Sequence, residues 1–236
     1  IGQSDVEIEA KIRDFDPDVV GVSILFSNLN QSGHNVARII KKINKSIKVI
    51  LGGNHISNSV VDYKNFIIHP GDKFPVIKDL EDPNIDFAII GESDFTLATF
   101  VDKIINNQDY SSIPGLAKKL PDGSYKINQT ARIEDVASLP IPARNLVNME
   151  GYFNIGAFHS AKSKSDRVLN IMCSRGCPEK CTFCTTPQMW GAKVRWRNLD
   201  DIVQEIKQGV SQFNIKEIQF EDDTLTAQKN NLFELM

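Results

Sequence analysis

Apolar and polar positions in the first half of the chain alternate between two patterns, one typical of buried strands and one typical of amphipathic helices. The run DVVGVSILF, residues 18–26, is almost continuously apolar and β-branched, as expected for a strand covered on both faces. Residues 35–44 repeat apolar side chains at spacings of three and four, which predicts a helix. The same two patterns predict further strands at residues 47–53 and 85–92 and a helix at residues 95–105.

This alternation predicts an α/β fold, with a doubly wound, Rossmann-like parallel sheet and right-handed crossovers. Residues 62–84 are rich in turn formers and are expected to be irregular. In open sheets of this kind, ligands bind at the carboxyl ends of the strands. The segments at those ends are SNLNQSG, GGNHIS and GESDFT.

The second half of the chain repeats the order of strand, loop, helix and strand. Residues 114–133 first predict a short hairpin, and Pro140 and Pro142 then mark an extended stretch that can neither continue a helix nor join a sheet interior. Beyond it, we expect a strand at 166–173, a cysteine-rich loop, a helix at 198–210 capped by Asn198 or Asp200, and a strand at 216–223.

We therefore predict a first domain at residues 1–135, a linker at 136–165 and a second domain at 166–236. Two strands cannot close a barrel or cover their own faces, so we expect the second domain to continue beyond the sequence. The chain opens on Ile1 rather than methionine and ends inside a helical pattern, which also suggests a fragment.

Composition narrows the class of protein. Apolar residues make up 41% and charged residues 24% of the chain, as in ordinary globular proteins, and the net charge of -3 predicts no polyanion partner such as nucleic acid. The basic helix face at residues 38–45 is interpreted as solvated surface. No apolar run reaches the roughly 18 residues of a membrane span, and no signal peptide pattern is present, so we expect a cytoplasmic protein.

All four cysteines fall within CSRGCPEKCTFC, residues 173–184. Cys177, Cys181 and Cys184 form a C-x3-C-x2-C pattern, in which three thiolates could bind one metal centre. Structural zinc would want four ligands, usually as two separated pairs, and would need Cys173. A four-iron four-sulfur cluster held by three cysteines keeps one iron free for an exogenous ligand. Cys173 ends a predicted strand, and we interpret it as a buried structural thiol.

The cysteine loop, including Phe183 before its last cysteine, closely resembles the signature of the radical S-adenosylmethionine (radical SAM) enzymes. The resemblance implies that Cys177, Cys181 and Cys184 hold a 4Fe-4S cluster, whose open iron chelates S-adenosylmethionine and cleaves it to a 5'-deoxyadenosyl radical. It also implies a partial (βα) barrel and an electron donor such as flavodoxin or ferredoxin. Residues Glu221, Asp222 and Asp223 occupy the place of a family motif that holds the methionyl amino group, and a helix-capping role is the alternative for each.

The first domain resembles the cobalamin-binding domain that one subgroup of this family carries, with its usual first strand missing. The resemblance implies cobalamin across the carboxyl edge of the sheet, held by the following residues: Ser23, Ser27, Asn28, Gly52, Gly53, His55, Gly91 and Glu92. Other cobalamin domains supply a cobalt ligand from an Asp-x-His-x-x-Gly motif, which is absent here, so we predict no protein histidine on cobalt. His34, His55, His69 and His159 have no partners identifiable in the sequence.

These features together predict a cobalamin-dependent radical SAM enzyme, which we expect to transfer a methyl group to an unactivated carbon of a small-molecule substrate. Ring formation or methylthio transfer by a related radical enzyme is an alternative, although methylthio-transferring relatives have three more cysteines in the first domain. Other classes are a non-catalytic iron-sulfur electron carrier, which would need Cys173 as its fourth ligand, and a cobalamin-responsive binding module.

Overall fold

The computed structural model describes residues 3–65, 78–130, 132–154 and 163–236. It divides into two compact units, Gly2–Arg132 and Ile133–Met236. Each unit has its own hydrophobic core and is described by itself below. Residues of the expected linker up to Asn154 belong to the second unit by their contacts, while the domain bounds themselves stay a prediction.

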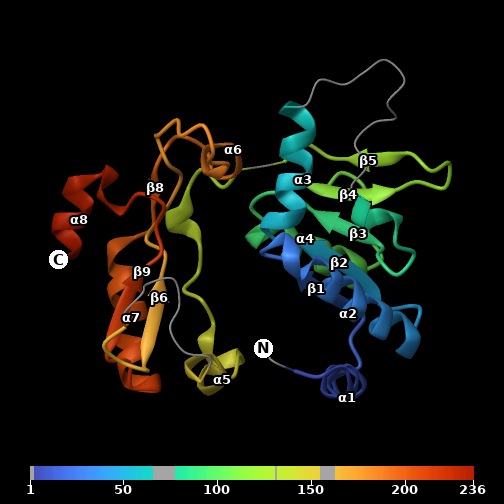
Figure 1. Ribbon diagram of the computed structural model, residues 1–236, viewed down its shortest axis with the longest axis horizontal. Helices are drawn as coiled ribbons and strands as arrows, with labels where there is room; N and C mark the ends of the chain where they lie inside the picture. The colour runs from blue at the N-terminus through green and yellow to red at the C-terminus, as the bar shows by residue number, and fades with distance from the viewer. Residues whose placement is uncertain (1–2, 66–77, 131, 155–162) are drawn as a thin grey trace. The chain divides into compact units, whose positions relative to one another are not determined.

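The first unit is built on a five-stranded sheet in the order β1-β2-β3-β4-β5 (Figure 1). Strands β1 (Val19–Ser23), β2 (Lys48–Gly52) and β3 (Phe87–Ile89) are parallel, as the apolar runs predicted. The predicted hairpin forms as β4 (Leu116–Lys119) and β5 (Tyr125–Ile127). It also extends the sheet, because β4 pairs antiparallel with β3.

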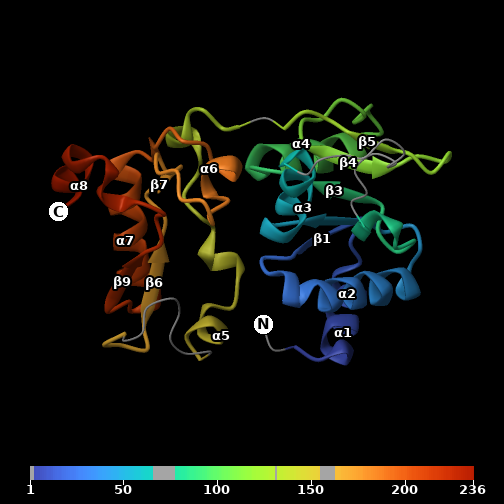
Figure 2. The same ribbon diagram turned by 45° about the horizontal axis from the view of Figure 1, so that its top comes forward.

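Helices cover both faces of this sheet. Helices α1 (Asp5–Phe15), α2 (Asn30–Ile43) and α3 (Asn54–Asn65) precede η2 (Lys78–Glu81), and α4 (Asp94–Ile105) follows β3. Figure 2 shows α2 lying along the sheet with α1 beneath it. One buried cluster joins α1, α2 and α3 to one face, and another joins Phe100 of α4 to Phe87 and Ile89 on the other face. This arrangement places the carboxyl ends of β1, β2 and β3 along one edge.

Three local expectations were wrong. The segment expected to be irregular begins inside α3, whose polar sequence NHISNSVVDYKN hides its helical pattern. Helix α2 begins at Asn30 rather than residue 35, because its first turn has polar side chains that add nothing to the apolar periodicity. Strand β1 ends at Ser23, and the apolar residues after it, Leu25 and Phe26, are more than half exposed rather than buried in the sheet.

The second unit contains two parallel strands, β6 (Val168–Ile171) and β9 (Glu217–Phe220), connected by α7 (Leu199–Phe213) (Figure 1). Asn198 caps α7 by accepting a hydrogen bond from the backbone of Asp200, which confirms one of the two predicted caps. The short strands β7 (Ser174–Arg175) and β8 (Arg195–Trp196) pair antiparallel and bracket the cysteine loop at its base.

Short helices complete this unit. They are η3 (Val136–Ser138), η4 (Arg144–Leu146), α5 (Met149–Phe153), α6 (Thr186–Met189), η5 (Leu225–Ala227) and α8 (Lys229–Leu235). The core gathers Leu169 and Ile171 of β6, Ile202 of α7 and Phe153 of α5, together with Cys173. Leu169, Ile171 and Cys173 are spaced two apart, so one face of β6 is packed into this core up to the start of the cysteine loop.

Candidate functional site

The cysteine loop begins directly after β7 and is shaped by backbone contacts. The N–H of Cys177 donates to the carbonyl of Gly191 over 3.1 Å, and the N–H of Cys184 donates to the carbonyl of Cys181 over 3.1 Å. Gly176 has φ +102°, and a Cβ there would lie 2.3 Å from the Lys193 carbonyl oxygen. Only glycine fits this position, so the turn that presents Cys177 depends on it.

The cysteines differ in their surroundings, and Cys177 is largely buried like Cys173. Cys181 is exposed, Cys184 is half-buried, and Cys177 is 9% exposed with its Sγ 3.0 Å from Thr224 Oγ1. Cys173 is fully buried in the core of the second unit. Burial, and after it the charge of Asp222, raises the pKa of the Cys173 thiol to about 12. Cys173 is therefore protonated near neutral pH, as a structural thiol would be.

The possible metal ligands of the loop fit a four-iron cluster better than a single metal ion. Within the described ranges, no three His, Cys, Asp or Glu side chains are gathered around one point as the ligands of a single metal ion would be. Ligands of a four-iron cluster bind different irons, so their sulfur atoms need not converge on one point. Three thiols on one loop, with the fourth cysteine buried, match a cluster that keeps one iron open.

The three acids after β9 have different contacts. The carboxylate of Asp222 accepts hydrogen bonds from the backbone N–H of Cys173 at 3.0 Å and from the N–H and hydroxyl of Ser174 at 2.5 Å each. Glu221 accepts from the Asn170 side-chain amide at 2.7 Å. Asp222 thus fastens the start of the cysteine loop to the end of β9, a positional role that the sequence pattern did not reveal.

Asp223 is the most available of the three acids. The residue as a whole is exposed although its carboxyl group is partly buried, and in the described part of the chain that group accepts a hydrogen bond from the Thr186 hydroxyl at 3.2 Å. Burial of its carboxyl group raises the pKa of Asp223, and the hydrogen bond from Thr186 opposes that shift. Phe183, which the family resemblance placed beside S-adenosylmethionine, is 89% exposed.

In the first unit, the residues expected to bind cobalamin follow the carboxyl ends of three strands. Exposed Ser23 ends β1 and exposed Ser27 and Asn28 follow it, while Gly52 ends β2 and Gly53 and His55 come after it. The N–H of His55 donates to the carbonyl of Ile24 over 3.0 Å, and this contact joins the two segments. Gly53 has φ +96°, and a Cβ there would lie 2.6 Å from the Ile24 carbonyl oxygen, so this junction needs glycine.

The segment after β3 is less open. The N–H of Gly91 donates to the Ser57 hydroxyl over 3.0 Å, which ties the β3 segment to α3. Glu92 is only 5% exposed, so its side chain is largely withdrawn from solvent. Of the two residues expected to bind a ligand here, Gly91 is the more accessible.

Large apolar side chains are exposed in the same segments. Leu25, Phe26 and Leu29 after β1 are 52%, 57% and 45% exposed, and Phe95 and Leu97 at the start of α4 are 46% and 37% exposed. Exposed apolar side chains beside polar groups at the carboxyl ends of parallel strands favour a binding site there. A large flat ligand with apolar faces and a polar rim, such as a corrin, fits this combination.

Two histidines have partners that the sequence did not reveal. His34 Nδ1 lies 2.6 Å from Asp82 Oδ2, and His34 Nε2 lies 2.9 Å from Asp79 Oδ1. His55 Nδ1 lies 2.9 Å from Ser27 Oγ. Burial alone would lower the pKa of His34, but the hydrogen bonds to Asp82 and Asp79 outweigh it and raise that pKa. His69 and His159 lie outside the described residues.

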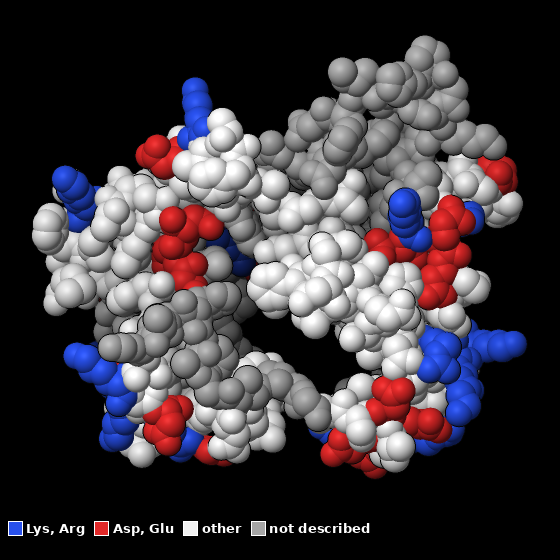
Figure 3. Space-filling model, in the orientation of Figure 1, with Lys and Arg blue, Asp and Glu red and all other residues white. Residues whose placement is uncertain are grey.

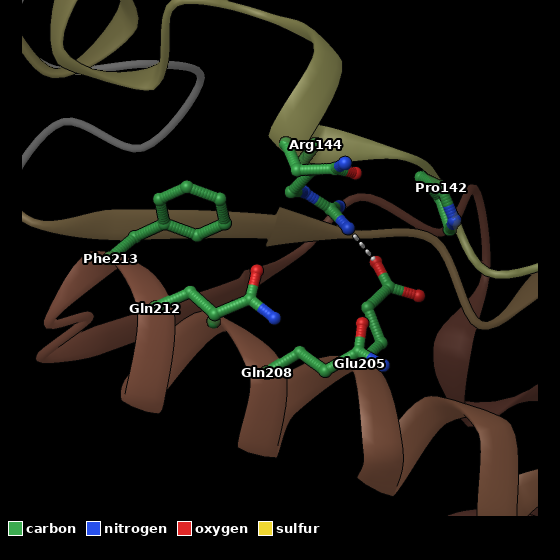
Figure 4. Close-up of a pocket in the computed structure, with 8 residues that line it drawn as sticks. Pro142, Arg144, Glu205, Gln208, Gln212 and Phe213 are labelled. Carbon is green, nitrogen blue, oxygen red and sulfur yellow. Dashed lines mark ion pairs between the residues drawn. The ribbon is translucent and has the colours of Figure 1, made fainter.

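A pocket of about 300 Å³ opens beside α7 in the second unit (Figure 4). Glu205, Gln208 and Gln212 project into it from one face of the helix, and Arg144 approaches from η4. Arg144 pairs with Glu205 at 2.5 Å, and Arg197 pairs with the other oxygen of Glu205 at 2.6 Å. Glu205 and Arg144 in the pocket are therefore already in ion pairs, which favours a structural role for these two residues.

Charge on the surface is mixed. On the face seen in Figure 3, Lys and Arg occur in separate groups interspersed with Asp and Glu. No helix in the described part of the chain is both long enough and apolar enough to cross a membrane.

Comparison with known proteins gives matches for both units. Residues 2–69 match the model of the B12 binding domain, and residues 171–236 match that of the radical SAM superfamily. Cytidylyl-2-hydroxyethylphosphonate methyltransferase of Streptomyces wedmorensis is 29% identical over 99% of this chain and 45% of its own length. An uncharacterized methyltransferase of Pyrococcus horikoshii is 30% identical over 97% of this chain and 44% of its own.

Solved structures share the fold. The radical S-adenosylmethionine methyltransferase TsrM from Kitasatospora setae, with tryptophan substrate and an S-adenosylmethionine analogue bound, superimposes with a TM-score of 0.70. It is 18% identical in sequence, and the match covers 98% of this chain and 42% of TsrM. The α/β architecture, with a parallel-sheet B12-binding domain before a partial radical SAM region, is thereby confirmed. The chain spans less than half the length of each of these relatives.

Proposed function

Because this chain is a radical SAM superfamily protein with an amino-terminal B12-binding domain, we propose that it is part of a cobalamin-dependent enzyme that cleaves S-adenosylmethionine reductively and transfers a methyl group. The observation that carries the proposal is the sorting of the four cysteines, with three on the loop and Cys173 buried as a thiol. The two relatives reported above that share almost the whole chain are both named methyltransferases.

In this proposal, Cys177, Cys181 and Cys184 hold the 4Fe-4S cluster. When bound, the cluster would supply the electron that cleaves S-adenosylmethionine, and cobalamin would supply the methyl group. The electron itself would come from a reduced donor of the flavodoxin or ferredoxin class. Gly176 and Asp222 hold the loop in place at its start, through the close approach to Lys193 and the hydrogen bonds to Cys173 and Ser174.

We assign the amino group of S-adenosylmethionine to Asp223. Glu221 and Asp222 are already engaged by Asn170 and by the start of the loop, whereas the Thr186 hydroxyl is the one hydrogen-bond donor to Asp223 among the described residues. A carboxylate is the natural partner of an ammonium group. Thr186 follows the last cysteine by two residues, so it keeps this carboxylate beside the cluster loop.

Cobalamin would lie at the carboxyl edge of the first unit's sheet. Exposed Leu25 and Phe26 offer apolar contact to the corrin, and Ser23, Ser27 and Asn28 offer polar contacts to its rim. Both nitrogens of His34 are occupied by carboxylates, which supports the expectation that this histidine does not bind cobalt.

The test is metal analysis and visible spectroscopy of the full-length protein purified without oxygen. We expect about four irons and one cobalt per chain, from the cluster and cobalamin stoichiometries. Reduction with S-adenosylmethionine should release 5'-deoxyadenosine. Iron without cobalt would remove the cobalamin assignment and leave the cysteine assignment standing.

Matched cysteine variants decide between this enzyme and an electron carrier. Cys181→Ala should lose the cluster, because it removes one of three ligands. Cys173→Ala should keep both iron and S-adenosylmethionine cleavage. Loss of iron from Cys173→Ala at unchanged folding would instead support a carrier whose four cluster positions are all filled by protein.

A further inference from the structure

Five polar side chains form a continuous chain behind the carboxyl edge of the first unit's sheet. It begins at exposed Ser27 in η1 (Ser27–Leu29), passes through His55 of α3 to Asp79 of η2, and ends at His34 of α2 and at Asp82. Asp79 is 4% exposed. Residues from the adjacent η1 and α2, from α3 and from the η2 region thus meet in one network, which we call the polar chain.

The protonation state of His34 follows from its neighbours. Its two ring nitrogens lie 2.6 Å from Asp82 and 2.9 Å from Asp79, and a carboxylate can only accept a hydrogen bond. Both nitrogens must therefore donate, and only the imidazolium has two N–H groups. In this arrangement His34 is a cation held between two anions.

The state of His55 follows from Asp79. One oxygen of Asp79 accepts from His34, and the other lies 3.8 Å from His55 Nε2. A negative oxygen beside Nε2 favours a proton on that nitrogen, because the other tautomer would turn a lone pair toward it. In neutral His55, Nδ1 then has no proton and must accept the hydrogen bond from the Ser27 hydroxyl at 2.9 Å.

We propose that Asp79, itself held by His34, fixes the Nε2–H tautomer of His55 and thereby turns the exposed Ser27 oxygen into a hydrogen-bond acceptor for a carboxamide N–H of the corrin rim. With its own proton committed to His55, the Ser27 hydroxyl can only accept from a ligand. The inference rests on the proposed function, since it assumes that cobalamin binds at this edge. His34 and Asp79 are then positioning residues, and Ser27 is the contact.

The orientation of the Ser27 hydroxyl determines which chemical group of a ligand can bind to it. Corrin rings carry primary carboxamides, whose N–H groups are donors that an acceptor-only hydroxyl would select. The exposed side chains of Leu25 and Phe26, close to Ser27 in the sequence, provide the apolar surface against which a ring could lie. A carboxylate at the same position of the ring would have no proton to give and would be rejected.

The first test needs no cofactor. Nitrogen-15 chemical shifts of the histidine rings in the cobalamin-free protein report which nitrogen carries the proton. We expect the Nε2–H form for His55 and both nitrogens protonated for His34. Asp79→Asn should shift His55 toward the Nδ1–H form, because an amide N–H can donate to Nε2. Asp82→Asn is the matched control and should leave the His55 tautomer unchanged. A wild-type His55 in the Nδ1–H form overturns the proposal.

The second test measures the affinity of the protein for hydroxocobalamin by equilibrium dialysis. Ser27→Ala should weaken binding about fivefold, the effect of one neutral hydrogen bond. Asp79→Asn should weaken it about threefold, and the double variant should bind no worse than Ser27→Ala, because both changes act on one hydroxyl. Binding that falls by the product of the two single effects overturns the proposal.

A third arm separates failure of this inference from failure of the proposed function. If wild-type protein does not bind hydroxocobalamin at all, the proposed function fails and the acceptor role of Ser27 fails with it, while the nitrogen-15 shifts still judge the tautomer. If wild-type protein binds it and Asp79→Asn binds equally well, with the melting temperatures unchanged, only the present inference is overturned.

Discussion

Replacing Glu205 should strongly lower the unfolding free energy of the second unit. Glu205 is 2% exposed and pairs with Arg144 at 2.5 Å and with Arg197 at 2.6 Å. Glu205→Gln keeps the size of the side chain and removes its charge, which leaves two guanidinium groups without their counterion. The same arginines donate to the backbone carbonyls of Asn170 and Met172, so the perturbation reaches the strand end that leads into the cysteine loop.

The magnitude follows from burial. Removing one partner of a buried ion pair costs about 3–5 kcal/mol, because the remaining charge is left unpaired. The Arg144 side chain is 20% exposed and that of Arg197 is 10% exposed, so both can regain some hydration. We therefore take the lower end, about 3 kcal/mol, which is roughly a hundredfold in the unfolding equilibrium.

The assay is urea unfolding followed by tryptophan fluorescence. Both tryptophans, Trp190 and Trp196, are in the second unit, so the signal reports on that unit alone. Lys207→Gln, an exposed change on the same helix, is the control and should change the unfolding free energy by less than about 0.5 kcal/mol. A loss below about 1 kcal/mol for Glu205→Gln would contradict this prediction, since it would mean that water already solvates the two arginines and Glu205.

Three further outcomes are expected. His34→Gln should destabilise the first unit most at about pH 5–6 and progressively less at higher pH. The raised pKa of His34 means that its contribution to folding stability is present below the ordinary value near 6.5 and is lost as pH rises through the folded value. Urea midpoints across this range measure the difference, and a difference independent of pH would contradict the prediction. Gly176→Ala should lower iron incorporation severely, because its Cβ would collide with the Lys193 carbonyl oxygen, and iron content equal to wild type would contradict this. Asp222→Asn should speed hydrogen exchange at the N–H groups of residues 173 and 174, whereas Asp223→Asn should leave that exchange unchanged and weaken S-adenosylmethionine binding; the reverse pattern would exchange the two roles.

The sequence predicted best those elements whose buried positions are apolar at a regular spacing along the chain. Strand β2 lies within its predicted run, since strands buried on both faces must be apolar at every position. Helix α7 shows its apolar spacing and its Asn198 cap together, so its start was predictable. Helix α3 was missed because its sequence contains several Asn and Ser residues, which are common in turns and interrupt the apolar spacing.

The candidate site divides in the same way. The spacing of Cys177, Cys181 and Cys184 is a local property of one loop, and so is the predicted burial of Cys173 at the end of an apolar strand, which the structure confirms. The acids after β9 could be named from the sequence but not ranked. Which of them is free depends on the partner that β6 brings to each, and that pairing joins residues about 50 positions apart.

The amino-acid order is therefore enough to predict a three-thiol loop, a parallel sheet with small and polar residues at its carboxyl ends, and an acidic turn near the loop in the fold. The partner of each polar group depends on how distant elements pack. His34 and Asp79 are 45 residues apart and meet because α2 and η2 pack together, which turns two unremarkable side chains into an ion pair. Hydrogen bonds between distant elements leave no period in a sequence, because each partner alone looks like ordinary surface.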